Sequence, residues 1–297
     1  MSLTVPTSPT PAAPAATSAR RRRPRVPFKG DPLGRCGLVL LIALLAIGLL
    51  GPALPIGSPT ESTGDRLAPP GDGHLLGTDE LGRALLPRIV EGIRETILIA
   101  TVVVLVATVI GVLAGCFAAL ASRRVDELIV RVTDVVFSFP VFLIAILVSV
   151  VAGPGRAAAM AAVFAVTLPT MVRVVRAAAL PVVERDFVTA AEVAGASRWR
   201  LLRVHLLPNV RSVVIGQVAY AISLGMLIEG GMSFLGLGVQ APAASLGSLV
   251  GSGRLYLTID PAYALVPGVV LGLAVLAFNL VGDALRRETD PILEREA

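Results

Sequence analysis

The side chains that could do chemistry in this chain are a few carboxylates and one amide within or beside long apolar segments. Glu229 lies in the glycine-rich sequence LIEGGMSFLGLGVQ, Asp134 and Asp283 lie near the ends of apolar segments, and Asn279 lies in LAFNLVGD. A carboxylate at the centre of a bilayer costs roughly 2.5–3.5 kcal/mol on insertion scales, so each needs a compensating contact. Glu229, Asp134 and Asn279 are therefore the candidate residues of a transport pathway or gate.

A structural role competes with transport chemistry at each position. Glu229 fits two roles equally well, a contact with substrate or gate and a carboxylate satisfied by backbone N–H groups at a helix break. For Asp134 and Asp283, capping or snorkelling at a helix end is favoured. Asn279 is expected to bond a neighbouring helix more than a ligand.

The histidines and cysteines predict no catalytic or metal site. His74 and His205 fall in polar segments predicted on opposite sides of a membrane, and Cys36 and Cys116 are isolated thiols in or beside apolar segments. The sequence contains no G-x-x-x-x-G-K-[ST], so the chain cannot cradle nucleotide phosphates by itself. We expect no enzyme activity and no cofactor in this chain, with any ATP and Mg²⁺ used by a partner.

Composition indicates an integral membrane protein. The 297 residues are 55% hydrophobic with a mean hydropathy of +0.80, too apolar for a soluble domain of this size. Apolar runs of about 20 residues recur, each long enough to cross the hydrocarbon core. The net charge of +5 would suit nucleic acid, but the arginines flank apolar runs, which indicates membrane topology and lipid contact instead.

Six apolar segments predict an all-α protein with six transmembrane helices. Pro140 predicts a kink in the third segment, and helical spacing at 81–90 predicts a short helix in the interface plane. The predicted spans are 36–54, 93–121, 128–151, 157–175, 213–235 and 263–285.

Arginine placement predicts that both termini are cytoplasmic. With six spans and the N-terminus inside, twenty of the 26 basic residues fall on the cytoplasmic side, as the positive-inside rule requires.

The predicted organisation is a disordered basic tail (1–30), a first helix with an extracytoplasmic loop (31–91), a five-helix core with a cytoplasmic loop at 181–211 (92–285), and a cytoplasmic tail (286–297).

The polar stretch 187–209, FVTAAEVAGASRWRLLRVHLLPN, predicts two short helices joined at Gly195. Pro181 suits the first turn of the first helix, and Gly195 can take the left-handed conformation that ends it. Ser197 is a good N-cap for the second helix, and Pro208 is expected to end that helix. Arginines and apolar residues alternate in the second helix, which is typical of an element lying on a membrane surface or in a partner's groove.

This stretch resembles the cytoplasmic coupling loop, the EAA motif, of bacterial ABC importer permeases. The chain departs from that pattern at Thr189, where an acidic residue is usual, although Glu192 lies one turn further on. The matching residues are Ala190, Ala191, Gly195, Leu207 and Pro208, and the resemblance assigns ATPase coupling to Thr189, Ala190, Ala191, Glu192, Gly195, Ala196, Arg198, Leu207 and Pro208.

Further motifs extend the resemblance over about 28–292, to the C-type permease of dipeptide, oligopeptide and nickel importers. LLGTDELGR, EGIRETILIA, VTDVVFSFP, SFLGLGVQAP and LAFNLVGD follow in the family's order, with departures at Ala84 and Pro87. The resemblance implies a type I ABC importer transmembrane fold in the cytoplasmic membrane. It also implies a heterodimer with a second permease. Two ATPases would bind on the cytoplasmic side, with a helix at 184–194 in the ATPase groove, and a binding protein or lipoprotein would bind on the outer side.

Two other classes of protein compete with this interpretation. An ATP-independent channel or secondary transporter predicts ionisable relays or broken half-helices near the midplane, and the sequence offers only scattered carboxylates. A membrane-anchored receptor or scaffold predicts a sizeable soluble domain, which no stretch provides. Within the importer family, dipeptides, longer peptides, nickel and haem remain open as substrates.

Overall fold

The structure is a computed structural model that describes residues 31–71 and 73–289. Within these ranges the regular structure is helical, and β-pairing is confined to isolated bridges in the loop that precedes α2. The predicted tail 1–30 and most of the predicted tail 286–297 lie outside the described residues, and 286–289 continue the last helix.

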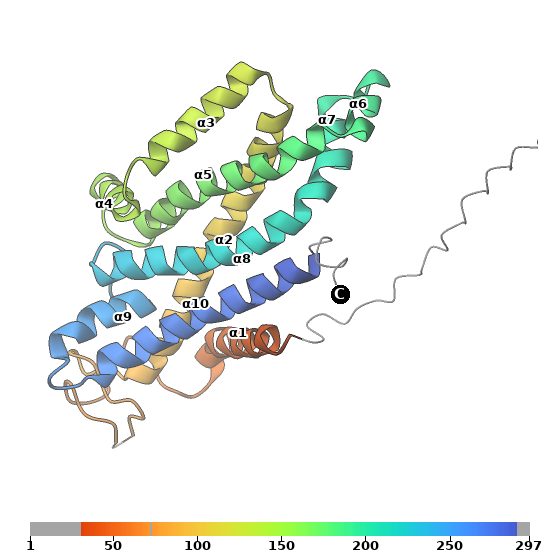
Figure 1. Cartoon of the computed structure of the whole chain (residues 1–297). Helices are drawn as coiled ribbons and strands as arrows, with labels where there is room; N and C mark the ends of the chain where they lie inside the picture. The colour runs from red at the N-terminus through yellow and green to blue at the C-terminus, as the bar shows by residue number, and fades with distance from the viewer. Residues whose placement is uncertain (1–30, 72, 290–297) are drawn as a thin grey trace, which may run out of the picture.

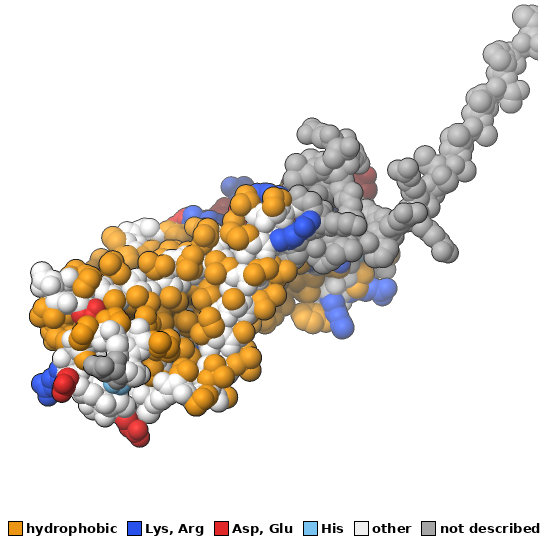
Figure 2. Space-filling view, turned by 90° about the horizontal axis from the view of Figure 1, so that it is seen from below, with side chains coloured by type: hydrophobic (Ala, Val, Ile, Leu, Met, Phe, Trp, Pro, Cys, Tyr) orange, Lys and Arg blue, Asp and Glu red, His pale blue; other side chains and the backbone are white. Residues whose placement is uncertain are grey.

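Five long helices form the body of the molecule. Each is long and apolar enough to cross a membrane, and they pack against one another in a bundle (Figure 1). Seen from below in Figure 2, hydrophobic side chains cover a broad face and charged side chains lie toward its ends, as expected for a surface in contact with lipid. The five are α1 (Pro32–Leu50), α2 (Leu85–Leu120), α5 (Arg156–Val183), α8 (Leu207–Phe234) and α10 (Ala262–Thr289).

The predicted third span is two helices, which corrects the expectation of one kinked helix. α3 (Arg123–Phe137) and α4 (Val141–Ala152) meet at Pro140 with a bend of 88°. Proline disfavours helical conformation at the residue before it, so the helix ends there. The described chain thus has five candidate spans, or six if the bent pair crosses as one unit.

The predicted interfacial helix at 81–90 is also wrong as a separate element. The backbone stays irregular up to Ala84, and α2 then runs without a break for 36 residues, about 54 Å at 1.5 Å per residue. The apolar spacing was real, but it belongs to the first turns of this long helix.

Short helices close the two ends of the bundle. The 3₁₀ turns η1 (Gly51–Ala53) and η3 (Arg254–Tyr256) and the helix α9 (Leu246–Gly253) lie at the end that carries the loop 54–84. At the opposite end lie α6 (Asp186–Val193), α7 (Arg198–Arg200) and the π-helical segment η2 (Leu201–Leu206), as Figure 1 shows.

Small residues let α2 and α5 approach closely. A Cβ atom on Gly115 would lie 2.8 Å from the carbonyl oxygen of Val172, and one on Gly111 would lie 2.7 Å from the Met171 Cβ. Helix association inside membranes depends on this kind of close van der Waals packing at small residues. At these two positions, therefore, glycine permits the close contact between α2 and α5.

We predict that Gly115→Ala lowers the melting temperature of the purified chain. The added methyl group must push α5 away, and overpacking of this kind costs about 1–3 kcal/mol. Gly272→Ala in α10 is the matched control, because its Cβ would meet no heavy atom within 4 Å. Equal melting temperatures for the two variants would show that α2 and α5 are not in tight contact at Gly115.

Candidate functional site

The polar segment 184–206 projects from one end of the bundle, between α5 and α8 (Figure 1). Its first helix begins later than predicted. Pro181 does not start α6 but lies inside α5, which continues to Val183, and α6 begins at Asp186. A proline inside a membrane helix is tolerated where neighbouring groups satisfy the freed carbonyl group.

The turn after α6 matches the sequence prediction. Gly195 has a φ of +81°, the left-handed conformation that favours glycine. Ser197 caps α7 by accepting a hydrogen bond from the backbone N–H of Arg200 at 3.3 Å. The two helices are therefore joined at Gly195 as expected.

The second helix does not end at Pro208, contrary to the prediction. α7 passes through η2 directly into α8, and Pro208 occupies the first turn of α8, where its missing N–H costs little. Within this passage the side-chain amide of Asn209 donates a hydrogen bond to the carbonyl oxygen of His205 at 2.6 Å. The helix thus continues from α7 through η2 into α8 without a break.

One face of the segment is anchored in the bundle. Leu201, Leu202 and Leu206 are buried, and the last two pack in a cluster with Val175 and Ala179 of α5. The aromatic rings of Phe187 and His205 lie 5.8 Å apart and hold α6 beside η2. The leucines therefore fix the orientation of the other face.

The other face is exposed, basic and apolar. Val193 is 86% exposed, Trp199 62% and Val204 54%, and exposed arginines alternate with them at 198, 200 and 203. Trp and Arg are the side chains most often found at the energetic centre of protein interfaces. Such a face on a short projecting element suits a partner protein.

The structure brings the nine predicted coupling residues to this one projecting segment and its junction with α8. Thr189, Ala190, Glu192, Gly195, Arg198 and Pro208 are exposed, whereas Ala191, Ala196 and Leu207 are half-buried.

Glu229 lies inside α8 and is fully buried. The Ser233 hydroxyl donates to its Oε1 at 2.7 Å and accepts a hydrogen bond from the backbone N–H of Val239 at 3.1 Å. The expected setting at a helix break with backbone N–H donors is therefore wrong. The carboxylate instead connects α8, through Ser233, to the chain that follows the helix.

Asp134 and Asn279 have partners within the chain. Asp134 forms an ion pair with Arg173 of α5, whose guanidinium group lies 4.3 Å from the centre of the Phe137 ring. Asn279 donates to the carbonyl oxygen of Val275 in its own helix at 3.0 Å, so the expected bond to a neighbouring helix is not the one formed. Asp283 is exposed near the end of α10.

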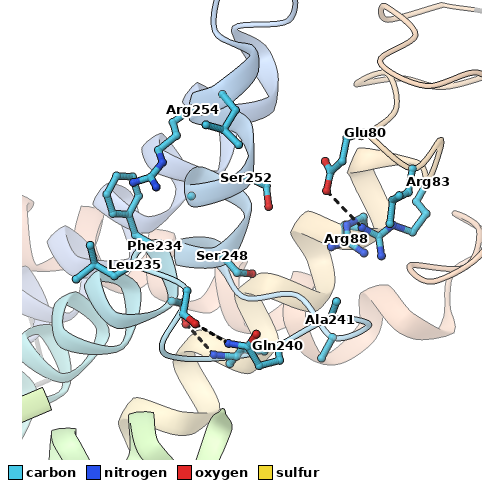
Figure 3. Close-up of a pocket in the computed structure, with 17 residues that line it drawn as sticks. Glu80, Arg83, Arg88, Phe234, Leu235, Gln240, Ala241, Ser248, Ser252 and Arg254 are labelled. Atoms are coloured by element: carbon cyan, nitrogen blue, oxygen red, sulfur yellow. Dashed lines mark hydrogen bonds and ion pairs between the residues drawn. The ribbon is translucent and has the colours of Figure 1, made fainter. Parts of the chain in front are cut away.

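A buried ionic cluster at the opposite end went unpredicted. The fully buried Asp79 carboxylate lies 2.7 Å from Arg83 Nε and 3.2 Å from Arg88 Nε, and Figure 3 shows both arginines beside Glu80. The Tyr263 hydroxyl of α10 donates to Glu80. This cluster ties the loop 54–84 to α2 and α10. Charged residues of LLGTDELGR were its only sequence signal.

Cysteines and acidic residues assemble no metal site in the part of the chain that the structure describes. No three His, Cys, Asp or Glu side chains there lie close enough to hold an ion. Cys36 is exposed on α1 and Cys116 is buried in α2.

Comparison with known proteins gives one family and several close relatives. Residues 107–294 match the family described as binding-protein-dependent transport system inner membrane component. A putative peptide transport system permease protein of Brucella abortus is 38% identical over 264 residues, 88% of each chain. A probable D,D-dipeptide transport system permease protein of Escherichia coli is 36% identical, with 89% of each chain covered. A di/tripeptide transport system permease protein of Pseudomonas aeruginosa is 37% identical, with 88% of each covered.

Among solved structures, the chain is similar to one from the MetNI methionine ABC transporter in an inward-facing conformation. The TM-score is 0.57 at 19% identity, with 68% of this chain and 96% of that chain covered. This likeness concerns the fold, which is that of a type I ABC importer permease.

We predict that Glu229→Gln keeps both the melting temperature and the transport activity, because the glutamine oxygen can still accept from Ser233. Glu229→Leu should cost about 1–3 kcal/mol of stability, since it leaves a buried hydroxyl group without its acceptor. Thermal melting and uptake in proteoliposomes would separate the two roles. Loss of uptake in a stable Glu229→Gln variant would contradict the structural role and assign function to the charge.

Proposed function

The chain belongs to the family of binding-protein-dependent transport system inner membrane components, and we propose that it is the permease subunit of an ATP-driven importer of dipeptides or oligopeptides. In this role it is a multi-pass protein of the cytoplasmic membrane. It pairs with a second, homologous permease and carries no catalytic site of its own. The observation that carries the proposal is the projecting segment 184–206, whose exposed face suits an ATPase partner.

The substrate class is taken from the relatives. Three relatives named for peptide, D,D-dipeptide and di/tripeptide transport are 36–38% identical over nearly the whole chain. Nickel and haem importers of the same family are the alternatives within this role. An extracytoplasmic binding protein or lipoprotein would deliver the substrate, and two ATPase subunits would bind ATP and Mg²⁺.

Charge placement supports a cytoplasmic location for the segment 184–206. It lies at the same end of the bundle as the start of α1 and the end of α10 (Figure 1). Arginines at 198, 200, 203, 211, 286 and 287 gather there, which favours that end as the cytoplasmic one. The end with α9 and the loop 54–84 is then extracytoplasmic.

The shape of the segment supports docking into a groove. On α6 the exposed positions include Thr189 and Ala190, so a partner's surface can approach the backbone closely. The buried Leu202 and Leu206 of η2 pack against the end of α5, and α6 contacts both η2 and α5. Movement of an ATPase bound here would therefore be passed to α5 and α8, which is the coupling that we propose.

The proposal is tested by purifying the chain with its neighbouring gene products and measuring ATP hydrolysis with and without the binding protein. A stable complex, stimulated by peptide-loaded binding protein and taking up peptide in proteoliposomes, is the expected result. Purification of the chain alone, with uptake that needs no ATP, would overturn the importer role and favour a channel or secondary transporter.

We predict that Ala191→Arg reduces co-purification of the ATPase by about tenfold, because it places bulk and charge on the face where the partner packs. Gly195→Pro should act in the same direction, since proline cannot adopt a φ of +81° and lacks the N–H that the Glu192 carbonyl accepts. The readout is the ratio of ATPase to permease in the purified complex.

The control is Ala157→Arg, an exposed alanine at the other end of α5. It adds the same charge far from the segment and should leave ATPase binding unchanged. If all three variants retain the ATPase and couple hydrolysis to uptake, segment 184–206 is not the coupling element.

A further inference from the structure

We propose that the cavity at the α9 end of this permease binds a short peptide in its zwitterionic form. The peptide carboxylate would meet Arg254, and the peptide ammonium group would face Glu80. The inference rests on the proposed function for the identity of the substrate. The cavity's charges and size support the site itself.

The cavity has a volume of about 360 Å³, which lies in the range of small-molecule sites. Its walls come from three parts of the chain: the residues just before and in the first turn of α2, the end of α8 with the loop 235–243, and α9 with η3. Figure 3 shows Arg254 and Glu80 on opposite sides of the space, with Ser252 between them. Two groups of opposite charge thus face a cavity of ligand size.

Arg254 is the cationic group that remains available. Arg83 and Arg88 are already within ion-pair distance of Asp79, whereas no carboxylate lies within 4.0 Å of Arg254 in residues 31–71 and 73–289. Its guanidinium carbon lies 4.5 Å from the centre of the Phe234 ring, a cation–π contact that holds the side chain at the cavity rim. A guanidinium group fixed in this way presents paired N–H donors suited to a carboxylate.

Glu80 supplies the opposite charge. One of its oxygens accepts from the Tyr263 hydroxyl, and the other lies 3.9 Å from Arg83 Nη2. A carboxylate offers about four acceptor positions, so these contacts leave room for a further donor such as an ammonium group. The carboxylate is held in place by Tyr263 and remains partly open to the cavity.

One polar side chain of the cavity wall, that of Gln240, suits a peptide bond. The Gln240 side-chain nitrogen donates to the carbonyl oxygens of Gly236 and Gly238, both at 2.9 Å. This fixes the amide group and leaves its own oxygen free to accept from a peptide N–H. The walls also include Phe234, Leu235 and Leu255, which can contact apolar side chains of a ligand.

The test measures peptide binding to the complete transporter in lipid nanodiscs, with no binding protein and no ATP. A free dipeptide, its C-terminal amide and its N-acetyl derivative are titrated and followed by saturation-transfer NMR. We expect the free dipeptide to bind most tightly. Arg254→Ala should raise its dissociation constant about fivefold, the upper range for an exposed ion pair, and abolish the preference for acid over amide.

Two further variants complete the design. Glu80→Gln should remove the preference for the free over the acetylated amino group, and its melting temperature reports any loosening through Tyr263. Arg66→Ala removes an exposed arginine of the loop 54–84 outside the cavity and should change nothing. Because Arg254 is exposed, its variant stays informative even if Glu80→Gln fails to fold.

Several outcomes would overturn the inference. Absence of saturable dipeptide binding to the wild-type complex, or equal binding of acid and amide, rules out a zwitterion site. If Arg254→Ala leaves peptide binding intact and raises only the binding-protein concentration needed for half-maximal uptake, Arg254 serves the binding protein instead. Failure of the proposed function would give a different result, because the wild-type complex would then show no ATP-driven peptide uptake.

Discussion

Polar groups inside an apolar bundle must find their partners within the protein, because hydrocarbon offers none. The rest of this structure depends on that constraint. It makes the described chain helical and pairs Glu229 with a serine hydroxyl. Burial inside the protein imposes the same need on Asp79 of the loop 54–84, which pairs with two arginines. Charges without such partners lie at the ends of the bundle, where water is available. The two ends are therefore the places where the chain can recognise other molecules.

The two ends have different characters, which fits a transporter subunit. At one end, exposed Trp199 and its neighbouring arginines form a projecting basic surface. At the other end, Glu80 and Arg254 face a cavity between α2 and α9. Convex surfaces suit partner proteins and concave ones suit small ligands. The long helices α5 and α8 run between these two ends and can carry movement from one to the other.

The sequence predicted the all-helical membrane class and the approximate positions of the spans from the lengths of apolar runs. Gly195 and Ser197 were also predictable, since their roles depend on local backbone geometry. The prolines were harder. Pro181 lies inside a helix and Pro208 begins one, because the packing around each decides whether the missing N–H breaks the helix. Long-range pairs such as Glu80 with Tyr263 have no local signal and were missed.

The direct passage from η2 into α8 has a mechanical consequence. No flexible loop separates them, so α7, η2 and the 28-residue α8 form one continuous helical arm. At 1.5 Å per residue the α8 part of this arm is about 42 Å long, and a tilt of about 10° at the start of α8 would displace its far end by roughly 7 Å. The far end carries Glu229 and leads into the loop beside the Arg254 cavity. A small rotation at the projecting surface thus becomes a displacement of several ångströms at the cavity end.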